Sequence, residues 1–483
     1  MISRFKEALF RGGNRVNRWW NAQDMDEKWV VVAVFFGYMA VFGLLAALTL
    51  AHQKSPVDLL IVTPKDATEY AMIAKNMVEH GRFTFFGTAL PEVFRTPVYP
   101  AFLAVIFAVA RTWYVVPLVQ SLIVACTAIL VLRFSKRFLP RWLALAVAAL
   151  FALDPMMMLG AFTTLTDVLY VAVMVWVIDR LVGRVQQGAQ ETGSRPWFFV
   201  SIGAALACAA LLRPIGLPLL GIALVGIPLF WRLEGLVSWR GACRVGLILA
   251  CSMACVVAPW YLRNRVVTGE WVFSTVSAYN MIAYNIAEYV STQERISLEE
   301  ARARLFAQAP DLRTAEDYRG VQVLPAYATI QRSFFARAFR PYVVFHARES
   351  MTLFVASGWN VAKSVVDRIT DAPRATTYNR GQLVAQRAWG SLARSLVSSP
   401  YELLFAFERV VYGLIALLAM FAPLLGERKH RYTFVAMLGF VWYVVAATGP
   451  VAMARYRLPI WPFLLVLAGV SVLWVFKRIR SSS

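Results

Sequence analysis

The chain has 483 residues, of which 59% are apolar and only 16% are charged. Soluble domains average roughly 45–50% apolar and roughly 25% charged residues, so this composition excludes an ordinary soluble protein as well as a disordered or collagenous one. A formal net charge of +21 would suggest a nucleic-acid partner in a soluble protein. Here the Lys and Arg residues gather in short links between apolar runs, as the positive-inside rule describes. We therefore expect a polytopic membrane protein with no nucleic-acid partner.

Ten apolar runs are long enough, or nearly so, for a membrane span, which needs about 20 residues. They cover residues 29–50, 114–132, 142–153, 168–182, 197–212, 217–231, 245–262, 403–425, 432–448 and 459–476. The first run is long enough to stay in the membrane as an anchor, so we expect no cleavable signal peptide. The five cysteines form no C-x-x-C pair, which predicts neither a disulfide framework nor a zinc site.

A further apolar run, 98–110, is ambiguous by its length alone, and the distribution of cations decides how it is counted. With ten spans, the basic N-terminus and all later basic links lie on one side of the membrane. These links cover residues 133–141, 184–195, 232–244, 428–431 and 477–480. Counting 98–110 as a span would move all of these links to the outside. We therefore predict cytoplasmic termini and a juxtamembrane helix at 98–110.

This topology divides the chain into an all-α helical bundle and two external segments. We expect a cytoplasmic N-terminus (1–28), a transmembrane catalytic module (29–262) with a first external loop at 51–113, an external region (263–402), and C-terminal transmembrane helices with a cytoplasmic tail (403–483). Within the external region, Ser297-Leu-Glu-Glu300 is typical of a capping box and predicts a helix at 301–309. The apolar stretch 342–366 is interrupted by charges, which favours an interfacial helix over a span.

The first external loop carries the most informative motifs, which are Asp66-Ala-Thr-Glu69-Tyr70 and Arg95-Thr-Pro-Val-Tyr99. Asp66 is suited to cap a helix whose apolar stripe begins at Tyr70. The simpler interpretation is that Asp66 is only a cap and that Arg95 is only a cation reaching to the membrane surface. Composition and spacing leave both interpretations open.

Further motifs follow at the same predicted membrane face. They are Leu165-Thr-Asp167, Arg213-Pro214, Pro259-Trp-Tyr-Leu-Arg263-Asn264 and Arg455-Tyr456-Arg-Leu-Pro459. In this order, and together with the motifs of the first loop, they resemble the C-type (GT-C) glycosyltransferases. The resemblance is to the group of protein mannosyltransferases and lipid A aminoarabinose transferases known as family 39-like. It covers nearly the whole chain, and its specificity lies in the order of the motifs.

The resemblance implies a GT-C-like bundle in a bacterial inner membrane, with its active site on the external side. It implies an enzyme that transfers a sugar, with inversion, from a polyprenyl-phosphate donor to a lipid, glycan or protein acceptor. It also implies that membrane lipids surround the protein. A carboxylate suits the acceptor hydroxyl and arginine suits the donor phosphate. The roles that it implies are catalysis for Asp66 and Asp167, donor-phosphate binding for Arg95, Arg263 and Arg455, and substrate binding for Glu69, Tyr70, Tyr99, Arg213, Asn264 and Tyr456.

Alternatives stay open for two of these residues and for a metal. Asp167 could only cap the following helix, and Arg213 could only mark a kinked boundary. The mannosyltransferases have two adjacent acids where this chain has Asp66 followed by Ala67. Some aminoarabinose transferases have a Glu directly before the phosphate-binding cation, whereas here Phe94 precedes Arg95 and Glu92 lies two residues farther back. The four histidines show no metal-ligand spacing. We therefore predict no obligatory metal or other cofactor, with a divalent cation as the alternative.

Two other classes of membrane protein are alternatives to the transferase. O-antigen polymerases and ligases also have many spans and a large outer loop, but they usually keep their key Arg and His residues in that later loop. A transporter or flippase would place ionisable groups near the middle of the bilayer. In this chain the span interiors are nearly free of charge and the first loop carries most of the signal. This distribution favours the transferase.

Overall fold

The fold is known from a computed structural model, which describes residues 24–62, 65–85, 91–187, 196–308, 319–372 and 400–482. Every regular element in these ranges is a helix. This confirms the predicted all-α fold. The basic N-terminal residues 1–23, Arg195 and Ala309, which the sequence predictions included, lie outside the described residues.

Within the described ranges, seven helices are long and apolar enough to cross a membrane. They are α2 (Met25–Ala51), α5 (Val115–Lys136), α11 (Gly216–Leu233), α12 (Trp239–Thr268), α20 (Pro400–Leu425), α21 (Arg431–Thr448) and α22 (Trp461–Ser482). An eighth candidate span is a bent pair, α6 (Arg141–Ala152) and α7 (Pro155–Phe162), which meet at an angle of 50°. Asp154 stands at this bend, and its carboxylate caps α7 by accepting a hydrogen bond from the N–H of Met156.

The remaining two predicted spans also form helices, α8 (Asp167–Gln187) and α10 (Pro196–Leu212). Helix α10 has only 17 residues, and α8 carries Asp179, Arg180 and Arg184 in its second half. Helix α10 is therefore shorter than each of the seven long helices, and the apolar run of α8 is interrupted by charges. The ambiguous run 98–110 forms a separate short apolar helix, α4 (Val98–Ala110).

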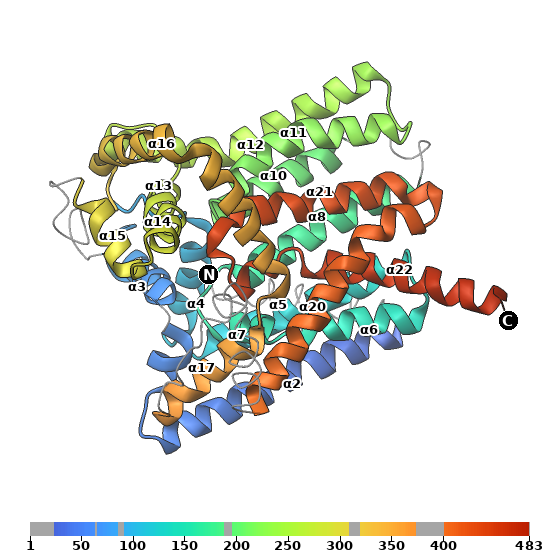
Figure 1. The fold of residues 1–483 in the computed structure, drawn as a ribbon, viewed down its shortest axis with the longest axis horizontal. Coiled ribbons are helices and arrows are strands. Elements are labelled where there is room, and N and C mark those ends of the chain that lie inside the picture. The colour runs from blue at the N-terminus through green and yellow to red at the C-terminus, as the bar shows by residue number, and fades with distance from the viewer. Residues whose placement is uncertain are drawn as a thin grey trace, which may run out of the picture.

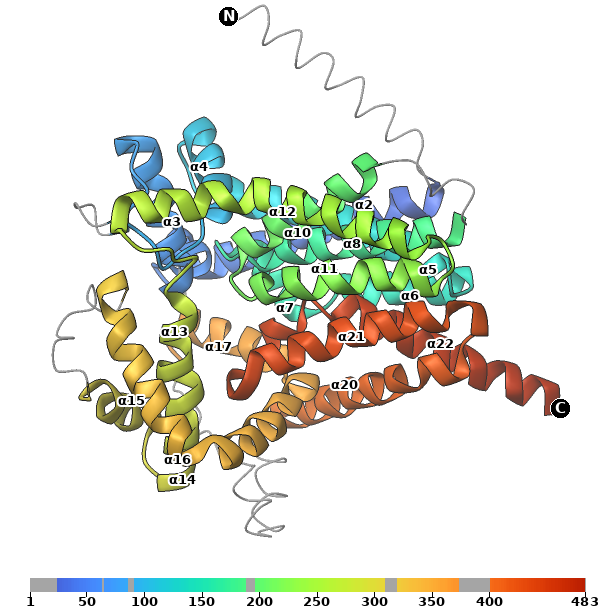
Figure 2. The same cartoon turned by 90° about the horizontal axis from the view of Figure 1, so that it is seen from above.

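A second group of helices lies at one end of the bundle, as Figures 1 and 2 show. This helical lobe consists of α13 (Val276–Asn280), α14 (Ala287–Glu294), α15 (Leu298–Phe306) and the first half of α16 (Leu324–Ser350), with its own small apolar core. The Ser297 hydroxyl caps α15 by accepting a 3.0 Å hydrogen bond from the N–H of Glu300, which confirms the predicted helix start. Helix α3 (Lys65–His80) lies at the same end of the bundle, and α22 ends at the opposite one (Figure 1).

The stretch 342–366, predicted as one interfacial helix, is divided among three elements. They are the end of α16, a 3-10 turn and α17 (Gly358–Thr370), whose first turn is capped by the Ser357 hydroxyl. Short π- and 3-10 elements complete the fold, and they are η1 (Val57–Val62), η2 (Met281–Ile286), η3 (Val321–Val323), η4 (Met351–Val355), η5 (Arg428–His430), η6 (Gly449–Val451) and η7 (Ala454–Arg457).

The end of the bundle away from the lobe is held by ion pairs between basic links and the acidic start of α2. Glu27 accepts two hydrogen bonds of 2.7 Å from Arg133, and Lys136 lies 2.7 Å from Asp24. These pairs bring the start of α2 and the end of α5 together at one membrane boundary. The assignment of this boundary to the cytoplasm stays a prediction.

Two buried polar side chains fix the segment that leads into α8. The amide nitrogen of Gln120 donates to the carbonyl oxygens of Ala161 and Thr163, at 3.1 and 2.7 Å. The hydroxyl of Thr164 lies 2.9 Å from the carbonyl oxygen of Ala67 in α3. The first external loop and the start of α8 are therefore held side by side.

Candidate active site

Helix α3 carries Asp66 and Glu69, and their spacing of three residues brings both side chains to one side of the helix. Arg95, in the loop before α4, lies between them. Its Nη2 is 2.8 Å from Asp66 Oδ1, and its Nε donates to Glu69 Oε2 at 2.7 Å. Asp66 lies within α3 and uses its carboxylate for these contacts. The interpretation of Asp66 as only a helix cap is therefore wrong.

Arg455 reaches the same carboxylate from the far end of the chain. Its Nη2 lies 2.8 Å from Asp66 Oδ2, so each carboxylate oxygen of Asp66 faces one guanidinium. Burial alone would raise the pKa of Asp66, but attraction and hydrogen bonds from Arg95 and Arg455 outweigh it and hold that pKa well below its usual range. Asp66 is therefore ionised, and it is a weak base as long as both arginines contact it.

Exposure distinguishes Asp66 from the other acids of the region. Its side chain is 33% exposed, whereas those of Glu69 and Asp167 are 5% and 3% exposed. The side chain of Glu92 is equally shielded, at 3%. Among these four acids, Asp66 is therefore the one that a substrate could contact without a rearrangement.

The second predicted acid, Asp167, forms its own ion pair beside this cluster. Asp167 is the first residue of α8 and pairs with Arg213, which directly follows α10. The ring of Tyr456 joins the two pairs, because the Arg213 guanidinium lies 5.4 Å and the Arg455 guanidinium 5.0 Å from its centre. Cation–π contacts of this kind add to the ion pairs. The structure thus brings Asp167, Arg213 and Tyr456 together with Arg455.

The cluster contains an arginine that the sequence analysis missed. Arg319, at the edge of the lobe, lies 2.9 Å from Glu69 Oε1 and 3.0 Å from Glu92 Oε2. Its guanidinium also lies 4.3 Å from the centre of the Phe94 ring. No motif surrounds Arg319, and its partners lie in a distant loop, so the sequence offers no signal for it. Glu69 is consequently a buried residue with two arginine partners.

Glu92 orders the loop that carries Arg95. Its Oε1 accepts hydrogen bonds from the backbone N–H groups of Phe94 and Arg95, at 2.6 and 2.9 Å. The other carboxylate oxygen faces Arg319. Loop 92–95 is thus fixed between α3 and the lobe, with the Arg95 side chain directed at Asp66.

Two predicted substrate-binding tyrosines lie behind Arg95. The guanidinium of Arg95 lies 5.0 Å from the Tyr70 ring, and the Tyr99 ring meets Tyr70 edge-on at 5.1 Å. Tyr99 is fully buried, and its hydroxyl donates to Gln120 at 2.9 Å. The Tyr70 ring thus packs against the Arg95 guanidinium, and Tyr99 packs against Tyr70.

Arg263 and Asn264 lie farther from Asp66 than the sequence analysis expected. Arg263 Nη1 donates to the carbonyl oxygen of Glu92 at 2.7 Å, and the buried Asn264 donates to the carbonyl oxygen of Val272 at 2.8 Å. Arg263 therefore fastens the end of α12 to the loop of Glu92, and Asn264 fastens the turn after α12 to the helix itself. Among the contacts of the described residues, neither one reaches Asp66.

Three buried polar atoms around this cluster have no hydrogen-bond partner among the described residues. They are the Nε of Arg455, the hydroxyl of Tyr170 and the hydroxyl of Thr96. Thr96 follows Arg95 in the chain, and the guanidinium of Arg213 lies 5.8 Å from the Tyr170 ring. Buried polar atoms are nearly always bonded. Three unpaired atoms beside these arginines indicate a place for a polar ligand.

The charges of the cluster balance. Four arginines (Arg95, Arg213, Arg319 and Arg455) face four acids (Asp66, Glu69, Glu92 and Asp167). An anionic ligand must therefore compete with a carboxylate for its arginines. In the part of the chain that the structure describes, no group of three or more His, Cys, Asp or Glu residues could hold a metal ion. The expectation that no metal is obligatory stays a prediction.

Comparison with known proteins gives no match to a family model or to a curated protein. Among solved structures, the chain is similar to the Archaeoglobus fulgidus oligosaccharyltransferase in its apo form (11% identity, TM-score 0.44) over 92% of this chain and 52% of that one. The same transferase tethered to an acceptor peptide with the NVT sequon matches at 11% identity, TM-score 0.45, over 92% and 50% of the two chains. ArnT from Cupriavidus metallidurans bound to undecaprenyl phosphate matches at 16% identity, TM-score 0.37, over 90% and 78%.

This chain spans about half the length of the oligosaccharyltransferase chains that it matches. At TM-scores below 0.5 the likeness gives no correspondence of single residues. The chemistry is therefore inferred from the residues of the site.

Proposed function

We propose that this chain is an integral-membrane glycosyltransferase that moves a sugar from a polyprenyl-phosphate donor to a lipid, glycan or protein acceptor. One observation carries the proposal: Asp66, the most exposed acid of the cluster, is held between Arg95 and Arg455, and Arg455 keeps an unpaired buried N–H. A carboxylate for the acceptor and two guanidiniums for the phosphate are what this transfer requires.

The donor phosphate binds at Arg95 and Arg455. A guanidinium offers several donors in a planar fork, and such charge-assisted bonds to phosphate are among the stronger hydrogen bonds in proteins. The unpaired Nε of Arg455 gives a phosphate oxygen a partner that costs no existing contact. As the bond between the anomeric carbon and the phosphate oxygen breaks, the phosphate gains a second negative charge. The two arginines stabilise this charge in the transition state.

Donor binding also changes Asp66. In the structure, Arg95 and Arg455 hold the pKa of Asp66 well below its usual range. A phosphate that takes up these guanidiniums weakens their attraction for Asp66, so its pKa rises and it becomes a stronger base. Asp66 then accepts the proton of the acceptor hydroxyl while the hydroxyl oxygen bonds to the anomeric carbon. The base is therefore strengthened when the donor is in place.

The exposure of the acids supports a single displacement, and thus inversion. A retaining mechanism needs a second carboxylate at the anomeric carbon. Asp167 is the nearest candidate, but its side chain is 3% exposed and paired with Arg213. In this proposal Asp167 positions Arg213 and Tyr456, and Glu69 and Arg319 hold Arg95 in place. Tyr99, Arg263 and Asn264 support the loops around them.

The test is sugar transfer by the purified chain in liposomes, with radiolabelled polyprenyl-phosphate sugars supplied one at a time. Membranes from a deletion strain provide the acceptor. We expect transfer of one sugar from one of these donors by the wild type, strongly reduced transfer by Asp66→Asn, and normal transfer by Glu79→Gln, an exposed acid of the same helix. Transfer of a whole oligosaccharide would favour a polymerase or ligase. Movement of lipid or solute without transfer would favour a flippase or transporter.

The membrane face of the site needs a separate measurement. The five native cysteines are replaced first, because three of them (Cys243, Cys251 and Cys255) are exposed. A single cysteine at Glu299 of the lobe should then react with an impermeant thiol reagent in intact cells, and one at Arg240 should be protected. The reverse pattern would place the site on the cytoplasmic side and contradict this part of the proposal.

A further inference from the structure

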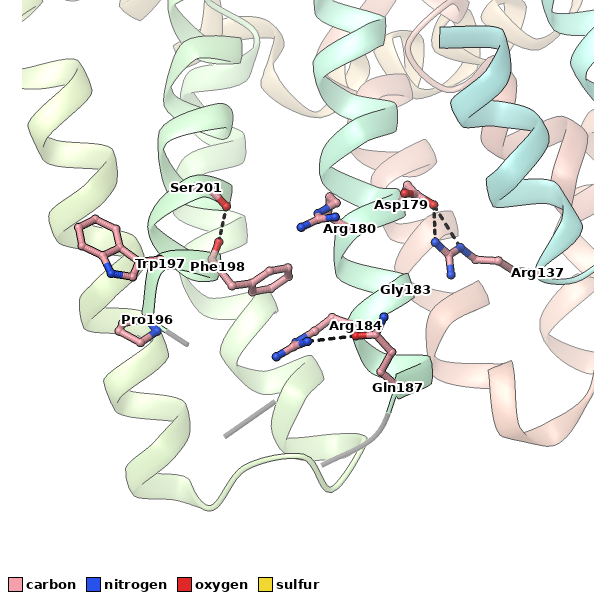
Figure 3. A pocket seen from close by; sticks show the side chains of 10 residues that line it. All are labelled: Arg137, Asp179, Arg180, Gly183, Arg184, Gln187, Pro196, Trp197, Phe198 and Ser201. Atoms are coloured by element: carbon pink, nitrogen blue, oxygen red, sulfur yellow. Dashed lines mark hydrogen bonds and ion pairs between the residues drawn. The ribbon is translucent and has the colours of Figure 1, made fainter. Parts of the chain in front are cut away.

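A cavity of about 620 Å³ lies between the ends of α8 and α10 (Figure 3). Its polar wall comes from Arg137, after α5, and from Asp179, Arg180 and Arg184 of α8. Pro196, Trp197 and Phe198, at the start of α10, form an apolar wall on the other side. The volume is in the range of small-molecule sites, roughly 300–1,000 Å³.

The cavity holds more positive than negative charge. The guanidinium of Arg137 is bound to the one lining carboxylate, with its Nη2 2.9 Å from Asp179 Oδ1. Arg180 is exposed and has no hydrogen bond or ion pair with any residue that the structure describes. Its guanidinium lies 6.0 Å from the centre of the Trp176 ring. Arg184, one turn farther, donates to Gln187 at 3.0 Å. Figure 3 shows both arginines beside the gap between α8 and α10.

The cavity and the candidate active site lie at opposite ends of the same helices. Helix α8 begins with Asp167 and ends at Gln187, and its 21 residues span about 30 Å at about 1.5 Å per residue. Helix α10 runs the other way, from Trp197 at the cavity to Arg213 at the active site. This length matches the hydrocarbon thickness of a bilayer. The cavity therefore lies at headgroup level on the membrane face opposite to Asp66.

We propose that this cavity binds the headgroup of an anionic membrane phospholipid, with the phosphate on Arg180 and Arg184. Basic pockets between membrane helices are suited to such headgroups. The apolar wall distinguishes a lipid from free phosphate, because Trp197 is 79% exposed at the level where tryptophans meet the interface. The site is separate from the proposed catalytic residues, and lipid binding does not depend on sugar transfer.

The test is native mass spectrometry of the detergent-purified full chain, titrated with phosphatidylglycerol or phosphatidylcholine. The wild type should prefer phosphatidylglycerol. Arg180→Ala should weaken phosphatidylglycerol binding about fivefold, which is the loss in affinity expected when one cation near an anionic lipid surface is removed. Arg180→Glu should weaken it further. The matched control is Arg240→Ala, because Arg240 is exposed at the start of α12 and outside the cavity. Binding by this control should equal that of the wild type.

Three results would overturn the proposal. One is equal binding of the two lipids by the wild type, and another is equal loss in Arg180→Ala and Arg240→Ala. The third is displacement of phosphatidylglycerol by submillimolar inorganic phosphate, which would assign the cavity to a soluble phosphate. Arg180 is exposed and forms no ion pair among the described residues, so its variants should fold. Elution volume and melting temperature verify this before the titration.

Discussion

Two arginines two positions apart in η7 show how burial separates a chemical site from a structural one. Arg455 faces Asp66 at 2.8 Å, and Arg457 faces Asp154 at 3.6 Å. The side chain of Asp66 is 33% exposed, whereas that of Asp154 is completely buried. The two pairs have the same chemical groups, but only the first can meet a ligand.

The buried pair uses its bonding groups inside the protein. The Arg457 guanidinium lies 3.6 Å from the centre of the Tyr412 ring, and its Nη1 donates to the carbonyl oxygen of Ala356 at 2.6 Å. Asp154 accepts hydrogen bonds from the Tyr412 hydroxyl and from the N–H of Met156. This pair fastens the α6–α7 bend to η7. The Asp66 pair, in contrast, is partly exposed on both sides, with 21% of the Arg455 and 33% of the Asp66 side chain accessible. A ligand can therefore reach this pair and cannot reach the buried one.

The sharpest way to break this comparison is to neutralise each aspartate. Asp66→Asn should lower the transfer rate per folded protein by about 10²–10⁴-fold, the usual contribution of a general base, and the variant should still fold. Asp154→Asn should keep a measurable rate in the fraction that folds. The measurement is initial transfer rate per folded protein with donor in excess. More than about a tenth of the rate in Asp66→Asn, far short of the loss of a general base, would shift the search for the base to Asp167.

The second prediction concerns the buried arginine. Arg457→Ala leaves Asp154 as a buried charge without its ion-pair partner, which costs about 3–5 kcal/mol of stability. The melting temperature in detergent should fall strongly, while the folded fraction should keep the donor KM of the wild type. An unchanged melting temperature would show that the Arg457 pair has no structural role.

The third prediction concerns the accessible arginine. Arg455→Ala removes a charge-assisted contact worth about 1.5–3 kcal/mol, so the apparent KM for the donor should rise about 10–100-fold while stability changes little. Arg455→Lys should recover part of this loss, because lysine keeps the charge without the planar fork. The measurement is the dependence of rate on donor concentration. A normal donor KM in Arg455→Ala would contradict its role at the phosphate.

A smaller effect is expected at the buried acid that holds Arg95. Glu69→Gln weakens two ion pairs and keeps the side-chain volume, so the donor KM should rise about tenfold, equivalent to the value of one hydrogen bond to a charged group. Glu79→Gln, at the exposed end of the same helix, is the matched control. Equal kinetics for the two variants would show that Glu69 has no role in donor binding.

The smallest effect concerns pH. A carboxylate with a lowered folded-state pKa contributes stability that is fully present above its unfolded pKa, about 3.9 for Asp, and that is lost as the pH falls toward the folded value. The pKa of Asp66 is lowered well below its usual range. The difference in melting temperature between the wild type and Asp66→Asn should therefore stay constant from about pH 5 to 8. A difference that grows with pH across this window would show that Asp66 titrates within it.

The helices could be predicted well from the sequence, because long apolar runs must form helices in a membrane. Each of the ten predicted runs is helical, although the third is bent at Asp154 and α10 is short. The acids and arginines of the motifs lie at helix ends on one side of the bundle. This is why Asp66, Arg95 and Arg455 could be placed together before the structure was known.

Single long-range partners could not be predicted. Arg319 meets Glu92 across 227 residues, and neither stands in a pattern that points to the other. The same holds for Arg457 and Asp154, which pair inside the core. Arg263 belongs to a recognisable motif, yet nothing in the sequence indicates that its guanidinium donates to the backbone carbonyl oxygen of Glu92. Motifs identify helix ends, but the packing of loops decides which side chains meet.

The long separation of Asp66 from Arg455, 389 residues, has a consequence for biosynthesis. A chain made at about 5–20 residues per second needs about 20–80 s to add this length. During that interval Asp66 and Arg95 have already been made, but Arg455 has not. The proposed donor site is completed only by the segment that leads into α22. A nascent or interrupted chain without this segment lacks one of the two arginines that contact Asp66.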